Sequence, residues 1–294
     1  MTKIIAFHLP QFHCIPENDE WWGEGFTEWT NTKKATPLYK GHYQPREPYK
    51  DNYYNLLDKE SIKWQTDTAK KHGIYGFCYY HYWFNGKLLL EKPVEILLNE
   101  KDIEFPFCLC WANEPWTRAW DGGEKEVIMP QSYGNEENWE KHINYLLQFF
   151  KDERYIKIDN KPVFVIYRSN NINRCDELIS YWNEKCVENG FNGIYLIEEI
   201  NTFQDKPILK LSQAVLEFEP MLTVNNKASL VTKLNRRIKR VLRDKVNIKT
   251  LDTYDYDKIW KRIIGRKSNY DGKKYFMVDL LIGIIQQGKK RMLQ

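Results

Sequence analysis

Several features that would mark a membrane, secreted or nucleic-acid-binding protein are missing from this sequence. No apolar run approaches the roughly 20 residues of a membrane span, and no charged-then-apolar leader precedes Ile4. The 44 basic and 40 acidic side chains give a net charge of +4, which is too balanced to require a nucleic-acid partner. We therefore expect a cytoplasmic protein without an integral membrane segment. We expect any association with a larger assembly to be peripheral.

The six cysteines form no metal-binding pattern. Cys108-Leu-Cys110 is one residue short of a usual zinc knuckle, and no second pair follows it. These two cysteines and Cys78 lie in apolar runs, where free cysteine packs as a small hydrophobic residue. No glycine-rich nucleotide loop follows an apolar run either. We expect reduced thiols, no metal and no other cofactor.

Aromatic residues, by contrast, are abundant, with 11 Trp and 19 Tyr. Short apolar runs alternate with longer amphipathic stretches, which predicts a parallel sheet built through right-handed crossovers. The expected strands are 3–9, 74–83, 105–111, 162–167, 193–198 and 214–218. The expected helices are 58–72, 88–98, 136–150, 176–188 and 202–211, the last one interrupted by Pro207.

The favoured fold class is α/β, a (β/α)8 TIM-type barrel. Polar residues follow nearly every expected strand, whereas a doubly wound sheet, the alternative, gathers them at one switch point. A chain of 294 residues has room for such a barrel, which commonly takes roughly 250 residues.

The third strand ends in the most informative motif, Asn113-Glu-Pro-Trp-Thr-Arg118. A carboxylate, an amide and a guanidinium at the end of a buried strand are hard to explain by packing. Indole rings beside carboxylates suit sugars, because sugar C–H faces stack on aromatic rings while the hydroxyls need polar partners. The alternative is a tryptophan-rich core edge with a surface salt bridge.

The ends of the other strands carry similar chemistry. Six consecutive strands ending in polar or charged groups would require six coincidences if packing alone explained them. These ends are His8-Leu-Pro-Gln-Phe-His13 with the loop Glu20 to Asn31, the stretch Tyr79 to Asn85, Tyr167-Arg168, Glu198-Glu199 and Glu217-Phe-Glu219.

The sequence resembles the WbsX family of bacterial polysaccharide-biosynthesis proteins, which are grouped with the glycoside hydrolase family 99-like domain. Five stretches carry the resemblance, which runs from Lys3 to about Pro220. They are Ala6-Phe-His-Leu-Pro-Gln-Phe-His13, Asn18-Asp-Glu-Trp-Trp-Gly-Glu-Gly-Phe-Thr-Glu-Trp-Thr-Asn31, Gly41-His-Tyr-Gln-Pro45, Gly73-Ile-Tyr-Gly-Phe-Cys-Tyr-Tyr-His-Tyr-Trp-Phe-Asn-Gly86 and the Glu114 loop.

The resemblance implies a (β/α)8 barrel that acts on glycosidic bonds without a metal. The family 99 hydrolases are retaining endo-mannosidases with a Glu-Pro-aromatic-x-Arg loop, which matches Glu114 to Arg118. Glu114 is therefore the first catalytic carboxylate expected. Glycosidic chemistry needs a second one, and we predict Glu217, with Glu198 and Glu28 as alternatives.

Further side chains are expected to bind the glycan or sugar donor, each with a structural alternative. His8 could equally be a core histidine, and Arg118 could pair with Glu114 or Asp121 instead of a substrate anion. Residues 80, 81 and 83 alternate across a strand, so only part of that set can face the site. The expected substrate-binding set is His8, Gln11, His13, Trp22, Glu28, Trp29, Tyr80, His81, Trp83, Asn113, Trp116, Arg118, Tyr167 and Glu198.

The C-terminal stretch departs from the family. Two motifs that supply the seventh and eighth strands in full members, Trp-Asp-Asn-Thr-x-Arg and Asn-x-Trp-Asn-Glu-Trp, are missing. Codons that encode Met277 to Gly288 can, after a shift of two nucleotides, encode Gly-Gly-Phe-Ile-Asp-Trp-Asp-Asn-Thr-Ala-Arg. We therefore expect a single barrel domain, 1–276, incomplete at its C-terminus, and a frameshifted tail, 277–294; a natural short form is the alternative.

The sequence as a whole predicts a glycosyltransferase of lipopolysaccharide O-antigen or capsule biosynthesis. The alternatives are a retaining endo-glycosidase and a truncated, inactive or glycan-binding remnant. Transfer would need an activated sugar donor, whereas hydrolysis needs only glycan and water.

Overall fold

The computed structural model describes residues 3–118, 123–226, 234, 237, 238, 254–266, 270 and 272–279, and of residues 123–125, 226 and 275–279 the backbone alone. The predicted tail from residue 280 onward lies outside these ranges. Its altered reading frame and the domain boundary at 276 therefore stay predictions.

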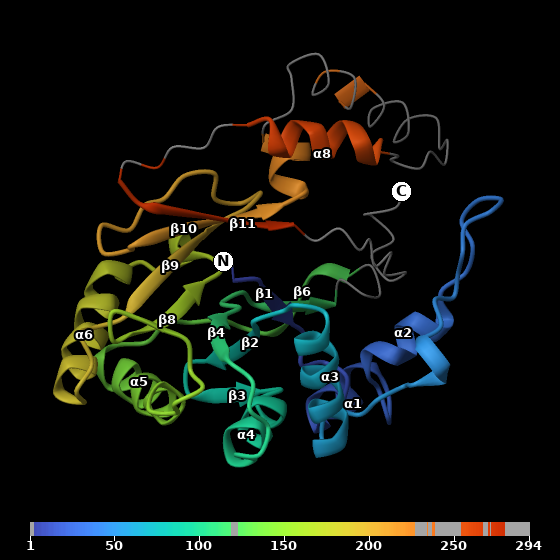
Figure 1. The fold of residues 1–294 in the computed structure, drawn as a ribbon. Coiled ribbons are helices and arrows are strands. Elements are labelled where there is room, and N and C mark those ends of the chain that lie inside the picture. The colour runs from blue at the N-terminus through green and yellow to red at the C-terminus, as the bar shows by residue number, and fades with distance from the viewer. Residues whose placement is uncertain are drawn as a thin grey trace.

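The core of the molecule is a nine-stranded sheet (Figure 1) whose main path runs β1-β2-β4-β8-β9-β10-β11. Every neighbouring pair along this path is parallel, and β3 and β7 are short antiparallel additions. A separate two-stranded sheet joins β5 and β6. The strands are β1 (Ile5–His8), β2 (Gly76–Phe84), β3 (Lys87–Leu89), β4 (Phe107–Trp111), β5 (Trp116–Arg118), β6 (Gly123–Met129), β7 (Lys157–Ile158), β8 (Lys161–Ile166), β9 (Tyr195–Ile200), β10 (Ala214–Glu219) and β11 (Lys274–Asp279).

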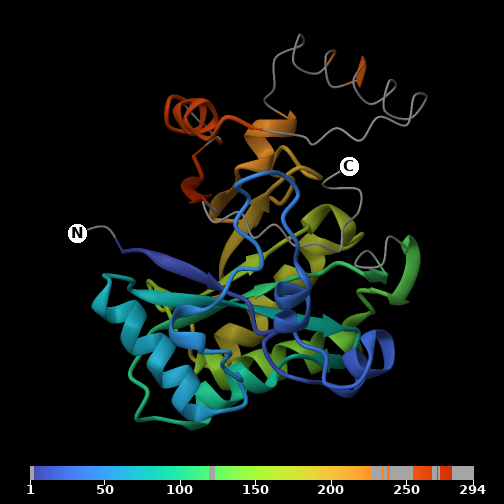
Figure 2. The ribbon, with the colours of Figure 1, turned by 90° about the vertical axis from the view of Figure 1, so that its right-hand side faces the viewer.

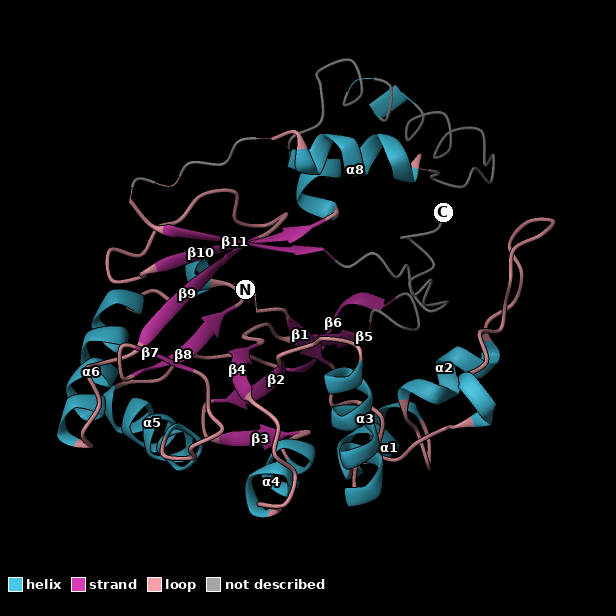
Figure 3. Cartoon of the chain, viewed as in Figure 1, coloured by secondary structure: helices cyan, strands magenta, loops and turns pink. Residues whose placement is uncertain are grey.

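The sheet curls into a half-barrel (Figure 3), which confirms the predicted incomplete TIM-type fold. Phe7 on β1 and Phe218 on β10 are far apart in strand order, yet their ring centroids lie 6.1 Å apart across the concave face. Strand β11 takes the seventh position of the barrel, beside β10. Within the described residues, β1 pairs only with β2, and β11 only with β10.

Helices connect the strands and cover the convex face (Figure 2). Their starts follow local signals: Asp58 accepts hydrogen bonds from the first turn of α3, and Asn135 does so for α5. None of the helices in the described ranges has the length and apolar character needed to cross a membrane. The helical elements are α1 (Pro16–Trp22), α2 (Glu28–Lys34), η1 (Tyr49–Asp51), α3 (Lys59–Lys71), α4 (Lys92–Asn99), α5 (Glu136–Phe150), η3 (Ser169–Asn171), α6 (Cys175–Glu188), η4 (Leu222–Asn226) and α8 (Tyr256–Ile264).

Two helix predictions need correction. The predicted helix 88–98 begins only at Lys92, after the short strand β3, and Pro93 lies in its first turn, where proline is tolerated. The predicted helix 202–211 is wrong, because this segment is a loop. Its backbone N–H groups at Ile208 and Leu209 donate to the Glu198 carboxylate instead of to helical carbonyls.

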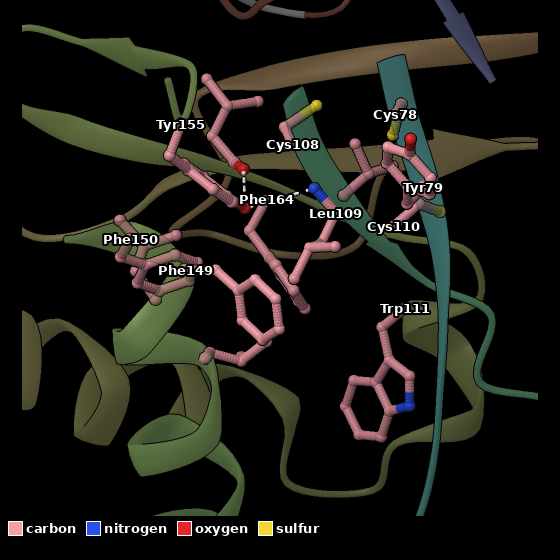
Figure 4. Close-up of a cluster of buried hydrophobic side chains, with 14 of the residues drawn as sticks. Cys78, Tyr79, Cys108, Leu109, Cys110, Trp111, Phe149, Phe150, Tyr155 and Phe164 are labelled. Carbon is pink, nitrogen blue, oxygen red and sulfur yellow. Dashed lines mark hydrogen bonds between the residues drawn. The ribbon is translucent and has the colours of Figure 1, made fainter. Parts of the chain in front are cut away.

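The main hydrophobic core includes side chains from both faces of the sheet and from the helices that cover its convex face (Figure 4). Trp111 on β4 packs against His142 on α5 and Trp182 on α6. Neighbouring strands are also tied by a buried hydroxyl, since Tyr155 Oη accepts from the Leu109 N–H at 3.2 Å and donates to the Val163 carbonyl at 2.8 Å. Because side chains alternate across a strand, the residues next to these on each strand face the concave side.

Candidate active site

The site is built around Glu114, which follows β4. Arg168, which follows β8, forms an ion pair with it through Nη1 and Oε1. The buried amide of Asn113 fixes the two loops together, because it donates to the Arg168 carbonyl and accepts from the Arg168 N–H, both at 2.8 Å. Parallel strands end at the same edge of the sheet, so this clamp holds the carboxylate and the guanidinium at the mouth of the half-barrel.

A second carboxyl group, Glu199 on β9, lies on the concave face beside this ion pair. Its side chain is fully buried, and Asn201 donates to Oε1 at 3.2 Å. Burial raises the pKa of Glu199 well above its ordinary value, and the negative charge of Glu114 raises it further. Within the described residues, Oε2 of Glu199 has no hydrogen-bond partner. Such an unpaired buried atom in a native site calls for a functional partner or a bound molecule.

Two tyrosines complete this group. Burial raises the pKa of Tyr167, at the end of β8, and the charges of Glu114 and Glu199 add to the effect. Burial and the charge of Glu199 act in the same way on Tyr80 of β2. The predicted site residues Asn113, Glu114, Tyr80 and Tyr167 therefore share one region of the concave face.

Phe203 covers this region from the loop after β9. Its ring centroid lies 4.3 Å from the Arg168 guanidinium carbon, and the side chain is largely exposed. The guanidinium is thus held between an aromatic ring and a carboxylate, which fixes its orientation.

The other predicted carboxylates lie elsewhere. Glu198 points to the convex side, where Ser169, Gln204 and Ser212 side chains and two loop N–H groups donate to it, so it anchors the loop 201–212. Glu217 also lies on the convex side of β10, bonded to Arg266 and to the hydroxyl of Tyr270. Glu217, predicted as the second catalytic carboxylate, therefore lies on the opposite side of the sheet from Glu199, because alternate residues of a strand face opposite sides.

Three more predicted residues belong to the convex core. His8 is buried beside α3 and bonds Gln65 at 2.8 Å, and burial lowers its pKa to about 4. His81 bonds His142 of α5 at 2.8 Å, and burial lowers the pKa of His81 to about 3. Trp83 stacks on His142 at 4.4 Å. These contacts are those of packing residues, so the structural alternative weighed for His8 applies to all three.

A second group of predicted residues lines the loop after β1. Gln11 donates to the hydroxyl of Tyr82 at 3.1 Å, and Trp116 packs edge-on against the same tyrosine ring at 5.2 Å. Glu28 lies close to this tyrosine, since its charge raises the pKa of Tyr82, and its own burial raises the pKa of Glu28 to about 7. This group borders the strands β1 and β2 and offers a carboxyl, an amide and an indole.

Of the remaining predicted residues, Trp29 has structural partners. Trp29 packs on Phe12 and donates from Nε1 to the Tyr54 carbonyl at 2.9 Å. His13 is buried, which lowers its pKa to about 4.

Arg118 bonds Glu126 at 2.7 Å and not Glu114, and its guanidinium carbon lies 5.8 Å from the ring of Trp22. The alternative partner Asp121 lies outside the described residues.

The sequence did not single out Glu199, Arg168, Asn201 or Phe203 as site residues. The pairs Tyr167-Arg168 and Glu198-Glu199 were recognised as strand ends, but which member faces the concave side depends on register. No group of three or more possible metal ligands occurs in the described part of the chain. All six cysteines are free thiols.

Paired carboxyl groups and aromatic side chains at the carboxyl ends of the strands of a half-barrel are chemically suited to contact with carbohydrate, whose hydroxyls need polar partners and whose C–H faces stack on rings. Comparison with known families agrees, because residues 4–280 match the family model described as glycosyltransferase WbsX. The chain belongs to this family.

Comparisons with individual proteins give matches over part of a chain or at low sequence identity. The uncharacterized protein WxcX of two Xanthomonas campestris pv. campestris strains is 38% identical over 195 residues, which are 66% of this chain and 28% of that protein. The matched region is thus a minor part of the relative's length.

Solved structures give a remote likeness. A glycoside hydrolase-like protein matches with 16% identity and a TM-score of 0.46, covering 76% of this chain and 63% of that one. The family 99 endo-alpha-mannosidase from Bacteroides thetaiotaomicron matches with 15% identity and a TM-score of 0.46, covering 81% and 68%. These values are too low to bear on the activity of this chain.

Proposed function

We propose that this protein is a glycosyltransferase of bacterial surface-polysaccharide biosynthesis, acting on lipopolysaccharide O-antigen or capsule, with Glu114 and Glu199 as its catalytic carboxyl groups. The family membership supports transfer of a sugar. The observation that carries the site is the pairing of an arginine-bound carboxylate with a buried carboxyl group whose pKa is raised. Two carboxyl groups in such different environments are suited to opposite roles in proton transfer.

In the proposed step, a hydroxyl of the acceptor sugar attacks the anomeric carbon of the donor. The new C–O bond forms as the bond to the leaving oxygen breaks. Glu114 takes the proton of the attacking hydroxyl, and Glu199, protonated at the start, gives its proton to the leaving oxygen. Tyr80 and Tyr167 lie near Glu199, whose burial keeps that carboxyl group neutral.

A donor sugar activated by a nucleotide implies work in the cytoplasm, and this location is part of the proposal. The six free thiols support it, because disulfides persist mainly in oxidising compartments. Peripheral association with a polysaccharide-assembly complex is a further part of the proposal.

A retaining endo-glycosidase is the second candidate. The same pair of carboxyl groups could cleave a glycosidic bond in two displacements. Glu199 would give its proton to the leaving oxygen while Glu114 bonds to the anomeric carbon, and water, deprotonated by Glu199, would then displace Glu114 with net retention of configuration. The two functions separate in one assay, because transfer requires an activated donor and hydrolysis proceeds on glycan and water alone.

Substitution of the two carboxyl groups tests the proposed site. Glu114→Gln and Glu199→Gln keep size and hydrogen bonding but remove proton transfer, so each should lower turnover by about 10²- to 10⁴-fold. Turnover should be measured as product formed per folded molecule from a labelled sugar donor and glycan acceptor. Glu217→Gln is the matched control, because it removes a buried charge on the opposite face of the sheet. If Glu199→Gln has normal turnover while Glu217→Gln loses it, the second catalytic carboxyl group is Glu217 and not Glu199.

A further inference from the structure

A segment of residues 36–50, here called the arm, projects from the body of the molecule after α2 and includes the first two residues of η1 (Figure 1). It belongs to the long connection that leaves the carboxyl end of β1 and returns through α3 to β2. None of the residues assigned to the proposed catalytic step lies in it.

The arm presents tyrosine rings to solvent. Tyr39 is 55% exposed, Tyr43 57% and Tyr49 76%, which is unusual for such large side chains when they serve packing. Flat aromatic rings stack on the C–H faces of sugars, and tyrosine adds a hydroxyl that can bond sugar hydroxyls.

Positive charges lie between these rings. The sequence of the arm has three cationic residues, Lys40, Arg46 and Lys50, and one acidic residue, Glu47. Two of the cations lie beside a ring, since the guanidinium carbon of Arg46 is 5.0 Å from the Tyr43 centroid and Nζ of Lys50 is 5.4 Å from the Tyr49 centroid. The repeated unit of the surface is thus a ring next to a cation, which fits a sugar that carries a carboxylate.

The tip of the arm is already shaped before any ligand binds. Tyr39 stacks on the buried His42 at 4.7 Å with an angle of 6° between the rings, and the Leu38 N–H donates to His42 Nδ1 at 3.1 Å. The turn between them needs Gly41, whose φ is 88°. A surface that is ordered in advance loses less entropy on binding.

A membrane surface fits the arm less well than a glycan. Segments that insert into the membrane interface expose tryptophan, phenylalanine or leucine next to their cations. The arm has no tryptophan or phenylalanine, and its one leucine, Leu38, is half-buried.

We propose that the arm is a secondary binding site for an acidic polysaccharide whose sugars carry carboxylates, lying apart from the catalytic carboxyl groups. The proposal rests on the proposed function in one respect, namely that the protein handles polysaccharide. The arm holds the polymer through ring stacking and through charge-assisted hydrogen bonds from Arg46 and the two lysines.

Binding of the full chain to polygalacturonate, with neutral dextran as the comparison polymer, tests the proposal. Lys40→Ala with Arg46→Ala should weaken binding to polygalacturonate by about tenfold or more at low salt. Lys70→Ala with Lys71→Ala is the matched control, because it removes the same charge from exposed positions at the end of α3, and it should bind normally. Tyr43→Ala with Tyr49→Ala should weaken binding even in high salt, where charge attraction is screened.

Unchanged binding in both arm variants, or an equal loss in the α3 control, would overturn the proposal. Binding of the wild-type chain to vesicles of phosphatidylglycerol and phosphatidylcholine, but not to polygalacturonate, would show a membrane site instead and would also overturn it. The variant Glu114→Gln distinguishes failure of the binding proposal from failure of the proposed function. It should bind polygalacturonate normally whatever its turnover.

Discussion

At the scale of single residues, the two adjacent glutamates of β9 have opposite environments. Glu198 accepts hydrogen bonds from five groups, whereas one oxygen of Glu199 has no partner among the described residues. The difference comes only from the side of the strand on which each lies. A satisfied carboxylate anchors structure, and an unsatisfied one with a raised pKa is free to exchange a proton with a substrate.

Glu28 gives a prediction about pH and stability. Burial raises its pKa from 4.5 to about 7, so folding favours the protonated form. This contribution to the free energy of unfolding is complete below pH 4.5 and is lost as the pH rises through about 7. The loss is up to about 3 kcal/mol. Urea unfolding should show a smaller fall in the free energy of unfolding between pH 5 and 8 in Glu28→Gln than in wild type. Glu24→Gln, an exposed change in the same loop, is the control, and equal pH dependence in wild type and Glu28→Gln would contradict the prediction.

At the scale of elements, the loop 201–212 depends on one buried carboxylate. Glu198→Ala leaves Ser169, Gln204, Ser212 and two backbone N–H groups without their acceptor, and should lower the free energy of unfolding by at least about 3 kcal/mol. Urea unfolding at pH 7 measures this loss, and limited proteolysis should show cleavage in 201–212 before the rest of the chain. A loop that resists protease as well as wild type would show that other contacts hold it.

The elements also show what the sequence could and could not predict. The strands and the helices α3, α5 and α6 follow from apolar periodicity, because burial repeats along them at a regular spacing. The helix predicted at 202–211 is wrong, because Pro207 interrupts the segment and its backbone N–H groups at Ile208 and Leu209 donate to Glu198 instead of to helical carbonyls. The arrangement of the candidate site was predictable in part for a similar reason. Asn113, Glu114 and Tyr167 follow strands directly, whereas which of Glu198 and Glu199 lies near them depends on the side of β9 on which each lies.

At the scale of the whole molecule, buried histidines should make the fold sensitive to acid. Burial lowers the pKa of His8 from 6.5 to about 4, so folding favours the neutral ring. The contribution of His8 is complete above pH 6.5 and is lost as the pH falls toward 4, by about 3 kcal/mol. His8→Gln should therefore show a shallower decline in the free energy of unfolding from pH 6.5 to 4 than wild type. Parallel declines in the two proteins would mean that other groups cause the acid sensitivity.

The opposite facing of Glu198 and Glu199 on β9 determines the effect of a one-residue insertion or deletion before this strand. Tyr195, Leu196 and Ile197 are apolar on both faces, so burial alone would tolerate a slip of one residue. An inserted residue before the strand would bring Glu198 to the concave position and leave the loop without its anchor. A deleted residue would bring Glu199 to the anchor position and leave the concave face without its carboxyl group. Insertions and deletions at this one point would therefore produce two different defects, a loosened loop in the first case and an inactive but well-folded protein in the second.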